Sequence, residues 1–117
     1  MLHGTWIPVT AELNGQPMPE ATLRSTKLVL EHGRYFATIG GVVDRGTLAL
    51  DLAREPKEMD ITGIEGPNKG RTIPAIYDLT GDILTVCYNL SGGQAPSEFR
   101  TVPNSNLFLV TYKRVAG

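Results

Sequence analysis

The sequence of 117 residues is poor in cysteine and has no strong charge of either sign. Its single cysteine, Cys87, excludes a disulfide within the chain and a zinc site built from several cysteines. The 11 basic and 12 acidic residues give a formal net charge of -1 and are scattered along the chain. Nucleic-acid binding needs a concentrated basic surface, so this composition argues against nucleic acid as a partner.

Long apolar runs are also missing. No run approaches the roughly 20 residues of a membrane-spanning helix, so we expect no membrane span. Residues 1–3 lead directly into the first expected strand, without the apolar core of a signal peptide. If Met1 is the native start, we expect a cytoplasmic protein, and if a leader was removed ahead of it, an exported one. No pattern in the sequence specifies an oligomeric state.

Turn residues are plentiful, with 13 glycines and 8 prolines. They divide the chain into alternating segments of about six to ten residues, a spacing typical of an all-β protein. We count eight main strands within one domain, residues 1–117. Consecutive antiparallel strands joined by short links favour an up-and-down barrel, because closure removes exposed strand edges. A β-sandwich is the alternative.

Three local features modify this pattern. Pro8 falls where the alternation of the first strand changes phase, so a β-bulge there is expected to turn both Trp6 and Val9 inward. Residues 19–25 are expected to form a short helical turn that covers one end of the barrel. Residues 98–100 are expected to add a short edge strand.

The two ends of the chain carry a pair of residues suited to closing the barrel. In such a barrel the first and last strands are neighbours, so the guanidinium of Arg114 can stack on the indole of Trp6. Tyr112 and Arg114 are two residues apart and therefore lie on one side of a strand. This second pair has two interpretations, closure of the barrel base or capture of a ligand carboxylate.

Gly4-Thr5-Trp6 resembles the Gly-x-Trp signature of lipocalins and related calycin barrels, and Arg114 resembles the arginine that packs across that Trp. The order of further short motifs is similar to a family of small bacterial lipocalin-like domains: Asn14-Gly15-Gln16-Pro17-Met18-Pro19, Gly66-Pro67-Asn68-Lys69-Gly70, Ile76-Tyr77-Asp78-Leu79, Gly81-Asp82-Ile83-Leu84 with Cys87, and Tyr112-Lys113-Arg114-Val115. The resemblance implies a lipocalin-like barrel and no particular ligand or activity. The chain is shorter than a typical lipocalin and lacks that family's disulfide. The resemblance therefore does not imply the large ligand-binding cavity of a typical lipocalin.

Residue types that are catalytic or bind metals in other proteins have structural interpretations in this sequence. Cys87 lies between Val86 and Tyr88 in an apolar segment, so we expect it to pack rather than react. His3 and His32 are not at metal-ligand spacing. Four carboxylates are spread over one strand and its flanks, as on a solvated face: Glu55, Glu58, Asp60 and Glu65. We expect no catalytic residues, no metal and no cofactor, and infer that the protein is not an enzyme.

Aromatic side chains with inward parity form the candidate ligand-binding set: Tyr35, Tyr77, Tyr88, Phe108 and Tyr112. They suit a pocket for a small apolar or amphipathic molecule, entered beside residues 15–24 and 91–97. The same side chains can instead fill an eight-stranded interior. The alternative is therefore a filled barrel acting as a protein-interaction or accessory module, with Phe36 and Ile76 as an outward contact patch. An inner cavity of a few hundred Å³ would separate the two.

Overall fold

The computed structural model describes residues 2–115, which form nine β-strands and one short helix. The strands are β1 Gly4–Leu13, β2 Gln16–Pro17, β3 Thr26–Glu31, β4 Arg34–Ile39, β5 Val42–Asp51, β6 Lys57–Glu65, β7 Thr72–Thr80, β8 Ile83–Asn89 and β9 Leu107–Val115. The helix, α1, is Glu20–Arg24. No helix in the described range has the length and apolar character that a membrane crossing requires.

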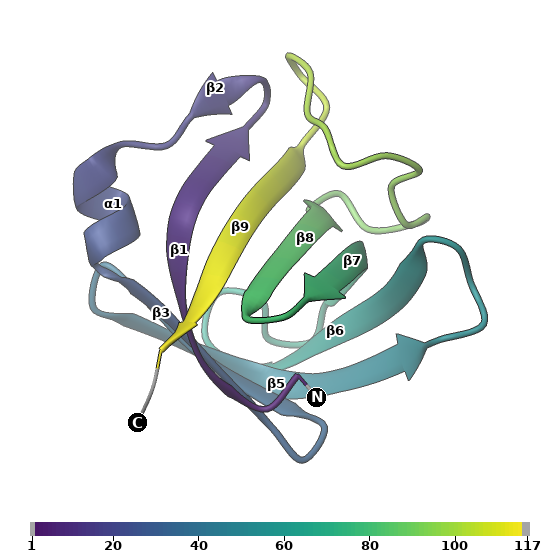
Figure 1. The fold of residues 1–117 in the computed structure, drawn as a ribbon, viewed down its shortest axis with the longest axis horizontal. Helices are drawn as coiled ribbons and strands as arrows, with labels where there is room; N and C mark the ends of the chain where they lie inside the picture. Colours follow the sequence, from purple (N-terminus) through teal and green to yellow (C-terminus); the bar gives the residue numbers. More distant parts are fainter. Residues whose placement is uncertain (1, 116–117) are drawn as a thin grey trace.

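The strands form one closed antiparallel barrel (Figure 1). From β3 to β9 each strand pairs with the next in sequence, β3 pairs with β1, and β9 returns to pair with β1. β2 pairs only with the end of β1, so the barrel wall contains eight of the nine strands found in residues 2–115. The predicted all-β, eight-stranded up-and-down barrel is confirmed, and so is the short helical turn.

The predicted bulge lies in β1, but its effect differs from the prediction. The register of β1 against β9 shifts between Pro8 and Thr10, which leaves Val9 between two paired positions. Trp6, Pro8 and Ala11 are therefore buried, whereas Val9 is 53% exposed. The expectation that Val9 points inward was wrong, because Pro8 keeps the parity of Trp6 and the extra residue comes after it.

Helix α1 lies in the crossover from β2 to β3 and packs beside β1 (Figure 1). The crossover is tied to the wall by the backbone N–H of Met18, which donates to the carbonyl of Ala11 at 2.9 Å. Glu20 in the first turn and Arg24 in the last form an exposed ion pair, 2.7 Å from Nη2 to Oε1. Their charges suit the helix dipole. None of the helix residues is buried, so α1 covers the barrel rather than entering it.

The core lies inside the barrel and takes side chains from around the wall. Its buried members are Trp6, Ala11, Leu28, Leu30, Tyr35, Ala37, Met59, Ile61, Ile73, Ala75, Tyr77, Leu84, Val86, Val110 and Tyr112. Leu50 has the inward parity of Leu48, yet it is 46% exposed because it borders a groove at the base of the barrel. Alternation along β5 therefore indicates the face correctly without indicating which residues are covered.

The connection from β8 to β9 folds back along the outside of the barrel (Figure 1). It covers Ile76 and Cys87, which are paired on β7 and β8 and lie outside the interior core. The thiol Sγ of Cys87 is 3.7 Å from the carbonyl oxygen of Arg100 in this connection. Ile76 is 1% exposed, so its expected place in an exposed patch was wrong, while Phe36 is 43% exposed. The expected edge strand at residues 98–100 is absent, because these residues belong to this irregular connection.

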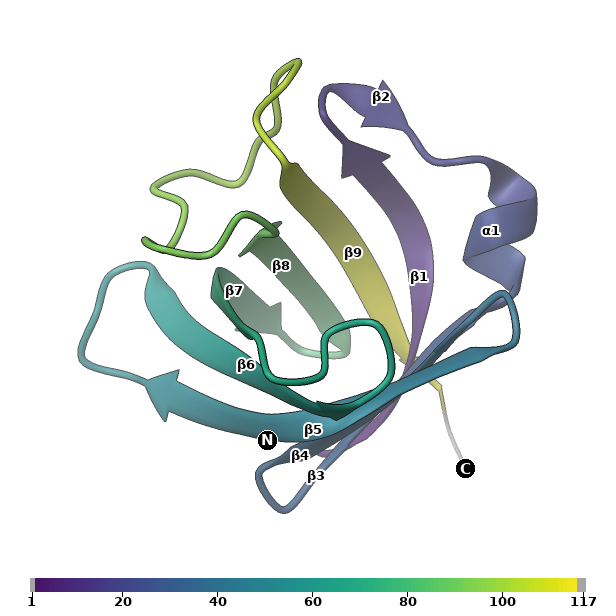
Figure 2. The same cartoon turned by 180° about the vertical axis from the view of Figure 1, so that it is seen from behind.

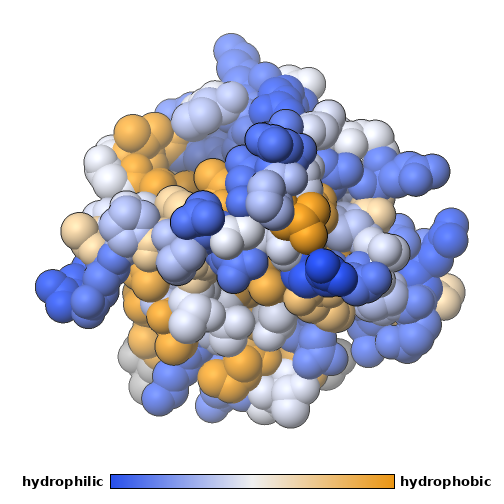
Figure 3. All heavy atoms as spheres, turned by 90° about the horizontal axis from the view of Figure 1, so that it is seen from above, coloured by the Kyte–Doolittle hydropathy of each residue, from blue (hydrophilic) through white to orange (hydrophobic). Residues whose placement is uncertain are grey.

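Side-chain bonds fix the β8–β9 connection to the turn between β1 and β2. The backbone N–H of Asn106 donates to Oδ1 of Asn14 at 2.6 Å, and the N–H of Gly15 donates to Oγ1 of Thr101 at 2.8 Å. These segments form the upper face of Figure 1, where hydrophobic patches interrupt a mostly hydrophilic surface (Figure 3).

Candidate binding cavity

A cavity of about 290 Å³ lies inside the barrel, bordered by the wall strands and the crossover that carries α1. Its aliphatic walls come from seven strands, through Ala11, Leu28, Leu30, Ala37, Met59, Ile61, Ile73, Leu84, Val86 and Val110. Met18, Thr22 and Leu23 contribute from the crossover, which includes the segment 15–24 predicted to lie beside the entrance. Residues 91–97, the other segment predicted to lie beside the entrance, do not border the cavity. From the β8–β9 connection, Leu90 borders it.

A cluster of three polar residues faces this cavity, and Asp44 on β5 is its centre. Asp44 is 7% exposed. The hydroxyl of Tyr35 donates to Oδ1 of Asp44 at 3.1 Å, and Nδ2 of Asn68 donates to Oδ2 at 2.7 Å. Burial, and then the charge of Asp44 and this hydrogen bond, raise the pKa of Tyr35 well above its ordinary value. The phenol therefore stays protonated and remains a donor to the carboxylate.

Two glycines allow these three side chains to meet. A Cβ on Gly46 would lie 2.8 Å from Cε2 of Tyr35, so the tyrosine ring crosses β5 where no side chain stands in its way. A Cβ on Gly63 would lie 2.1 Å from the carbonyl oxygen of Asn68, so the β6–β7 connection packs directly on β6. Figure 2 shows this connection in front of the barrel interior. The close approach of two backbones thus brings Asn68 to Asp44.

Tyr88 and Tyr112 form a second polar contact in the cavity wall. Their hydroxyl oxygens are 2.8 Å apart, and either can be the donor. Burial raises the pKa of Tyr112 to about 12, although the bond with Tyr88 lowers it slightly. Burial, followed by the influence of Tyr112, holds the pKa of Tyr88 well above its usual value. Phe108 stacks on Tyr88 with ring centroids 5.7 Å apart and an interplanar angle of 26°.

Of the five aromatic residues predicted to bind a ligand, the structure brings four together. Tyr35, Tyr88, Phe108 and Tyr112 border the cavity. Tyr77 points inward at the other end of the barrel, where it borders a groove of about 370 Å³ together with Leu50 and Leu52. The exposure of Leu50 and Leu52, 46% and 60%, makes this groove the more open of the two hollows. Burial raises the pKa of Tyr77.

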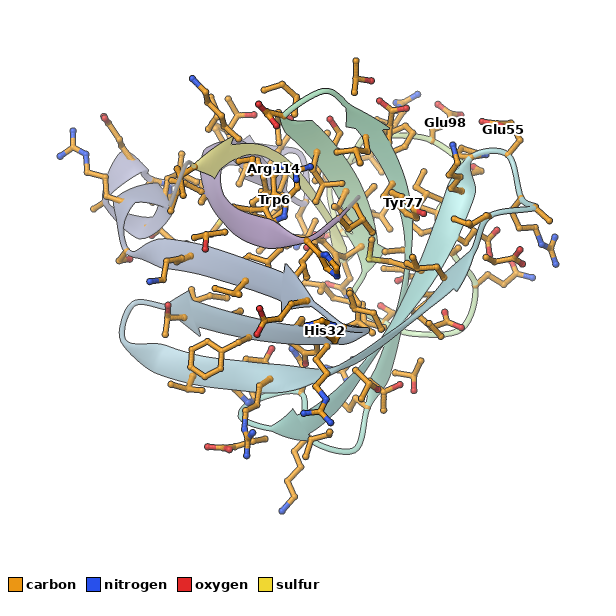
Figure 4. The ribbon with its side chains drawn as sticks, turned by 60° about the horizontal axis from the view of Figure 1, so that its bottom comes forward. Trp6, His32, Glu55, Tyr77, Glu98 and Arg114 are labelled. Carbon is orange, nitrogen blue, oxygen red and sulfur yellow. The ribbon has the colours of Figure 1, made fainter. Side chains whose placement is uncertain are left out.

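Trp6 and Arg114 lie next to each other where β1 and β9 meet (Figure 4). The Cζ atom of Arg114 is 4.6 Å from the centroid of the Trp6 ring. Nη1 of Arg114 also donates to the carbonyl of His3 at 2.9 Å, and its Nε is 3.2 Å from Oδ1 of Asp82. Neither Trp6 nor Arg114 borders the cavity, so Arg114 does not face a ligand there.

The fold brings His3 and His32 together, a contact that the sequence reasoning missed. Their ring centroids are 5.3 Å apart, and Nε2 of His3 accepts a bond from the backbone N–H of His32 at 3.4 Å. Both histidines border the groove at the base (His32 is labelled in Figure 4). Within residues 2–115, no group of three or more His, Cys, Asp or Glu side chains could hold a metal ion.

Cys87 is buried under the β8–β9 connection, outside the barrel interior. Burial raises the pKa of its thiol, and a hydrogen bond with the backbone of Arg100 lowers it only in part. A thiol of this kind is a poor nucleophile at neutral pH. Glu55 and Glu98 lie far from Trp6 and Arg114 in Figure 4.

Sequence reasoning missed the two most polar groups of the cavity, Asp44 and Asn68. A usable signal was present for Asp44, because it shares the parity of Leu48 and Leu50 on β5 and so has a carboxylate on an inward face. No such signal exists for Asn68, which belongs to a connection without alternation. Searches of known families, curated proteins and solved structures give no match to this chain.

Proposed function

We propose that the protein is a lipocalin-like binder that holds a small apolar or amphipathic molecule inside the barrel. The observation that carries the proposal is the cavity of about 290 Å³ with aliphatic walls and a few polar groups. Its volume is near the lower end of ligand pockets, which span about 300–1,000 Å³, and its composition is typical of them.

The competing interaction module finds less support. A filled barrel would be packed at interior density, with voids hardly larger than a water molecule. Its expected contact patch loses Ile76 to the β8–β9 connection and retains only Phe36. The cavity and the lost patch both favour binding inside the barrel.

The tyrosine hydroxyls need no ligand for their hydrogen bonds. Tyr35 donates to Asp44, and Tyr88 and Tyr112 bond to each other. A ligand therefore gains affinity from apolar contact with the walls and from polar groups that can still form further hydrogen bonds.

Binding without catalysis is part of the proposal. The polar groups around Asp44 and the Tyr88–Tyr112 pair are bonded among themselves, and the side chains that most often act as nucleophile or base lie elsewhere: Cys87 on the outer face and the histidines at the base. Catalysis of acyl or proton transfer would need a nucleophile and a base in hydrogen-bond contact.

Thermal unfolding with a panel of fatty alcohols, fatty acids and hydrophobic dyes tests the proposal. A ligand of the folded state at about 100 times its Kd should raise Tm by roughly 10 °C. Val110→Phe introduces a ring into the cavity wall and should abolish the shift, as should Ala37→Leu if the first variant folds poorly. Val42→Phe makes the same substitution at a position that is 52% exposed, and it should respond like the unaltered protein.

The outcome decides between the two functions. If no compound of the panel raises Tm, the carrier is excluded and the interaction module takes its place. If Val110→Phe, Ala37→Leu and Val42→Phe all respond like the unaltered protein, binding takes place outside the cavity and the proposal fails.

A further inference from the structure

We propose that the preferred ligand is an amphipathic amine, whose ammonium group binds the carboxylate of Asp44 while its apolar part fills the cavity. This inference rests on the proposed function and specifies the chemistry of its ligand. It departs from the capture of a ligand carboxylate, one of the two interpretations of Tyr112 and Arg114, which the charges of the cavity disfavour.

Asp44 is the one buried residue of residues 2–115 with a formal charge. The ion pairs of the described chain are all formed by other residues: Arg24 with Glu20, Arg45 with Glu65, Arg54 with Asp51, Arg100 with Glu98, and Arg114 with Asp82. A carboxylate removed from water is costly unless a cation or several donors compensate it. The structure thus places an anionic group on the cavity without a cation of the protein beside it.

Asp44 has bonding capacity left for a ligand. Each carboxylate oxygen accepts one bond from the protein, Oδ1 from Tyr35 and Oδ2 from Asn68. An ionised carboxylate offers about four acceptor positions, so roughly two are free for a donor that enters the cavity. An ammonium group supplies up to three donors and the missing positive charge, and charge-assisted bonds of this kind are about twice as strong as neutral ones.

The cavity offers no comparable site for an anion. Lys27 is the basic residue among those that border it, but Lys27 is exposed and has the parity opposite to that of buried Leu28 on β3. The other candidate for carboxylate capture, Arg114, stacks on Trp6 at the base. A fatty-acid carboxylate in the cavity would therefore meet the like charge of Asp44 without a cation to offset it.

The size of the cavity limits the ligand. At about 30 Å³ for each water-sized unit, 290 Å³ admits on the order of ten non-hydrogen atoms. A chain of eight carbons with one polar head fits this limit. Octylamine, octanol and octanoate share that chain and differ in the charge of the head, so they form a matched set of probes.

The experiment measures the Kd of the three probes by calorimetry at neutral pH, on the unaltered protein and on two variants. Asp44→Asn removes the charge and keeps the side-chain size, and the amide of Asn68 can rotate to accept a bond from it. Asp60→Asn removes an exposed carboxylate from the outer face of β6 and is the control for net charge. Near-ultraviolet circular dichroism verifies that each variant is folded.

We expect octylamine to bind the unaltered protein most tightly and octanoate most weakly. Removing one partner of a buried, bonded charge pair costs 2 kcal/mol or more, so Asp44→Asn should weaken octylamine roughly 30-fold or more. Octanol should change much less. Asp60→Asn should behave like the unaltered protein with all three probes.

Two other results would overturn the inference, and they differ from each other. If octanol or octanoate binds as tightly as octylamine, the cavity binds ligands without selecting an amine, and the proposed function stands alone. The ranking on the unaltered protein does not depend on the variants, so it decides this even if Asp44→Asn unfolds. If none of the three probes binds, the proposed function fails together with the inference.

Discussion

The contact between Trp6 and Arg114 predicts an energetic coupling across the junction of the first and last strands. The variants that test it are Trp6→Leu, Arg114→Lys and the double variant. Trp6→Leu removes the aromatic ring from a position with 0% exposure. Arg114→Lys keeps the charge and removes the planar guanidinium that lies 4.6 Å from the ring centroid.

The expected magnitudes follow from burial. Truncating a buried Trp costs about 3 to 5 kcal/mol, and leucine restores part of the lost contact, so Trp6→Leu should cost about 2 to 4 kcal/mol. The side chain of Arg114 is 29% exposed, which places its cation–π energy between exposed and desolvated cases, about 1 kcal/mol. Its ion pair with Asp82 adds little, because the Asp82 side chain is 72% exposed and screened by water.

Urea unfolding of the four proteins measures the coupling as a double-mutant cycle. We expect the double variant to lose about 1 kcal/mol less than the sum of the two single losses. Arg114→Lys loses the bonds of Arg114 to His3 and Asp82 whether or not Trp6 is present, so their energies cancel in the cycle. Additivity within about 0.3 kcal/mol would refute a stacking role for Arg114. If the double variant does not fold, the milder Trp6→Phe replaces Trp6→Leu.

Three further predictions concern the interior and its covering. Gly46→Ala should cost about 3 kcal/mol or more, since its Cβ would lie 1.9 Å from the carbonyl oxygen of Thr62. Gly81→Ala is the control for backbone strain alone, because its φ is +58° and the added Cβ meets no atom within 4 Å, so it should cost only about 1 to 2 kcal/mol. Equal urea midpoints for the two variants would contradict the packing around Asp44. Cys87→Ala should lower the free energy of unfolding by about 1 kcal/mol or more. It should leave the ligand-induced shift in Tm unchanged, because the thiol lies outside the cavity. If the variant is stable but no ligand shifts its Tm, that placement of Cys87 is contradicted. All four tyrosines have a raised pKa, so above pH 10 the unfolded chain ionises first and stability should fall by up to about 1.4 kcal/mol per pH unit for each tyrosine. Tyrosinate absorbance should then rise together with unfolding, and a rise near pH 10 in the folded protein would contradict the burial of these hydroxyls.

The barrel could be predicted because its determinants are local. Alternation within each segment gives the face of each strand, and glycine and proline mark the turns, so the order of strands follows without knowledge of distant contacts. The neighbouring positions of Trp6 and Arg114 follow from closure alone. The bulge at Pro8 was predictable in place but not in effect, since alternation does not tell which of two adjacent residues loses its partner.

Features that depend on irregular segments could not be predicted. Ile76 and Cys87 have the outward parity of a solvated face, and only the folded β8–β9 connection buries them. Asn68 reaches Asp44 because the β6–β7 connection packs on Gly63, a contact between backbones that alternation does not encode. The interior is divided into a cavity and a basal groove, which separates Tyr77 from the other aromatic residues, and strand parity does not tell which of the two an inward side chain borders.

The cost of the cavity itself argues for an occupant with two kinds of surface. The apolar side chains around this space lose the packing contacts that a filled interior would give them, and this loss costs stability. Water recovers that cost only where each molecule finds two to four polar partners, and most of the lining residues are apolar and offer none. The aliphatic part of the wall is better satisfied by an apolar chain. A molecule with a donor head for Asp44 and an apolar body for the walls meets both requirements at once, which is why the polar cluster and the cavity volume point to the same class of ligand.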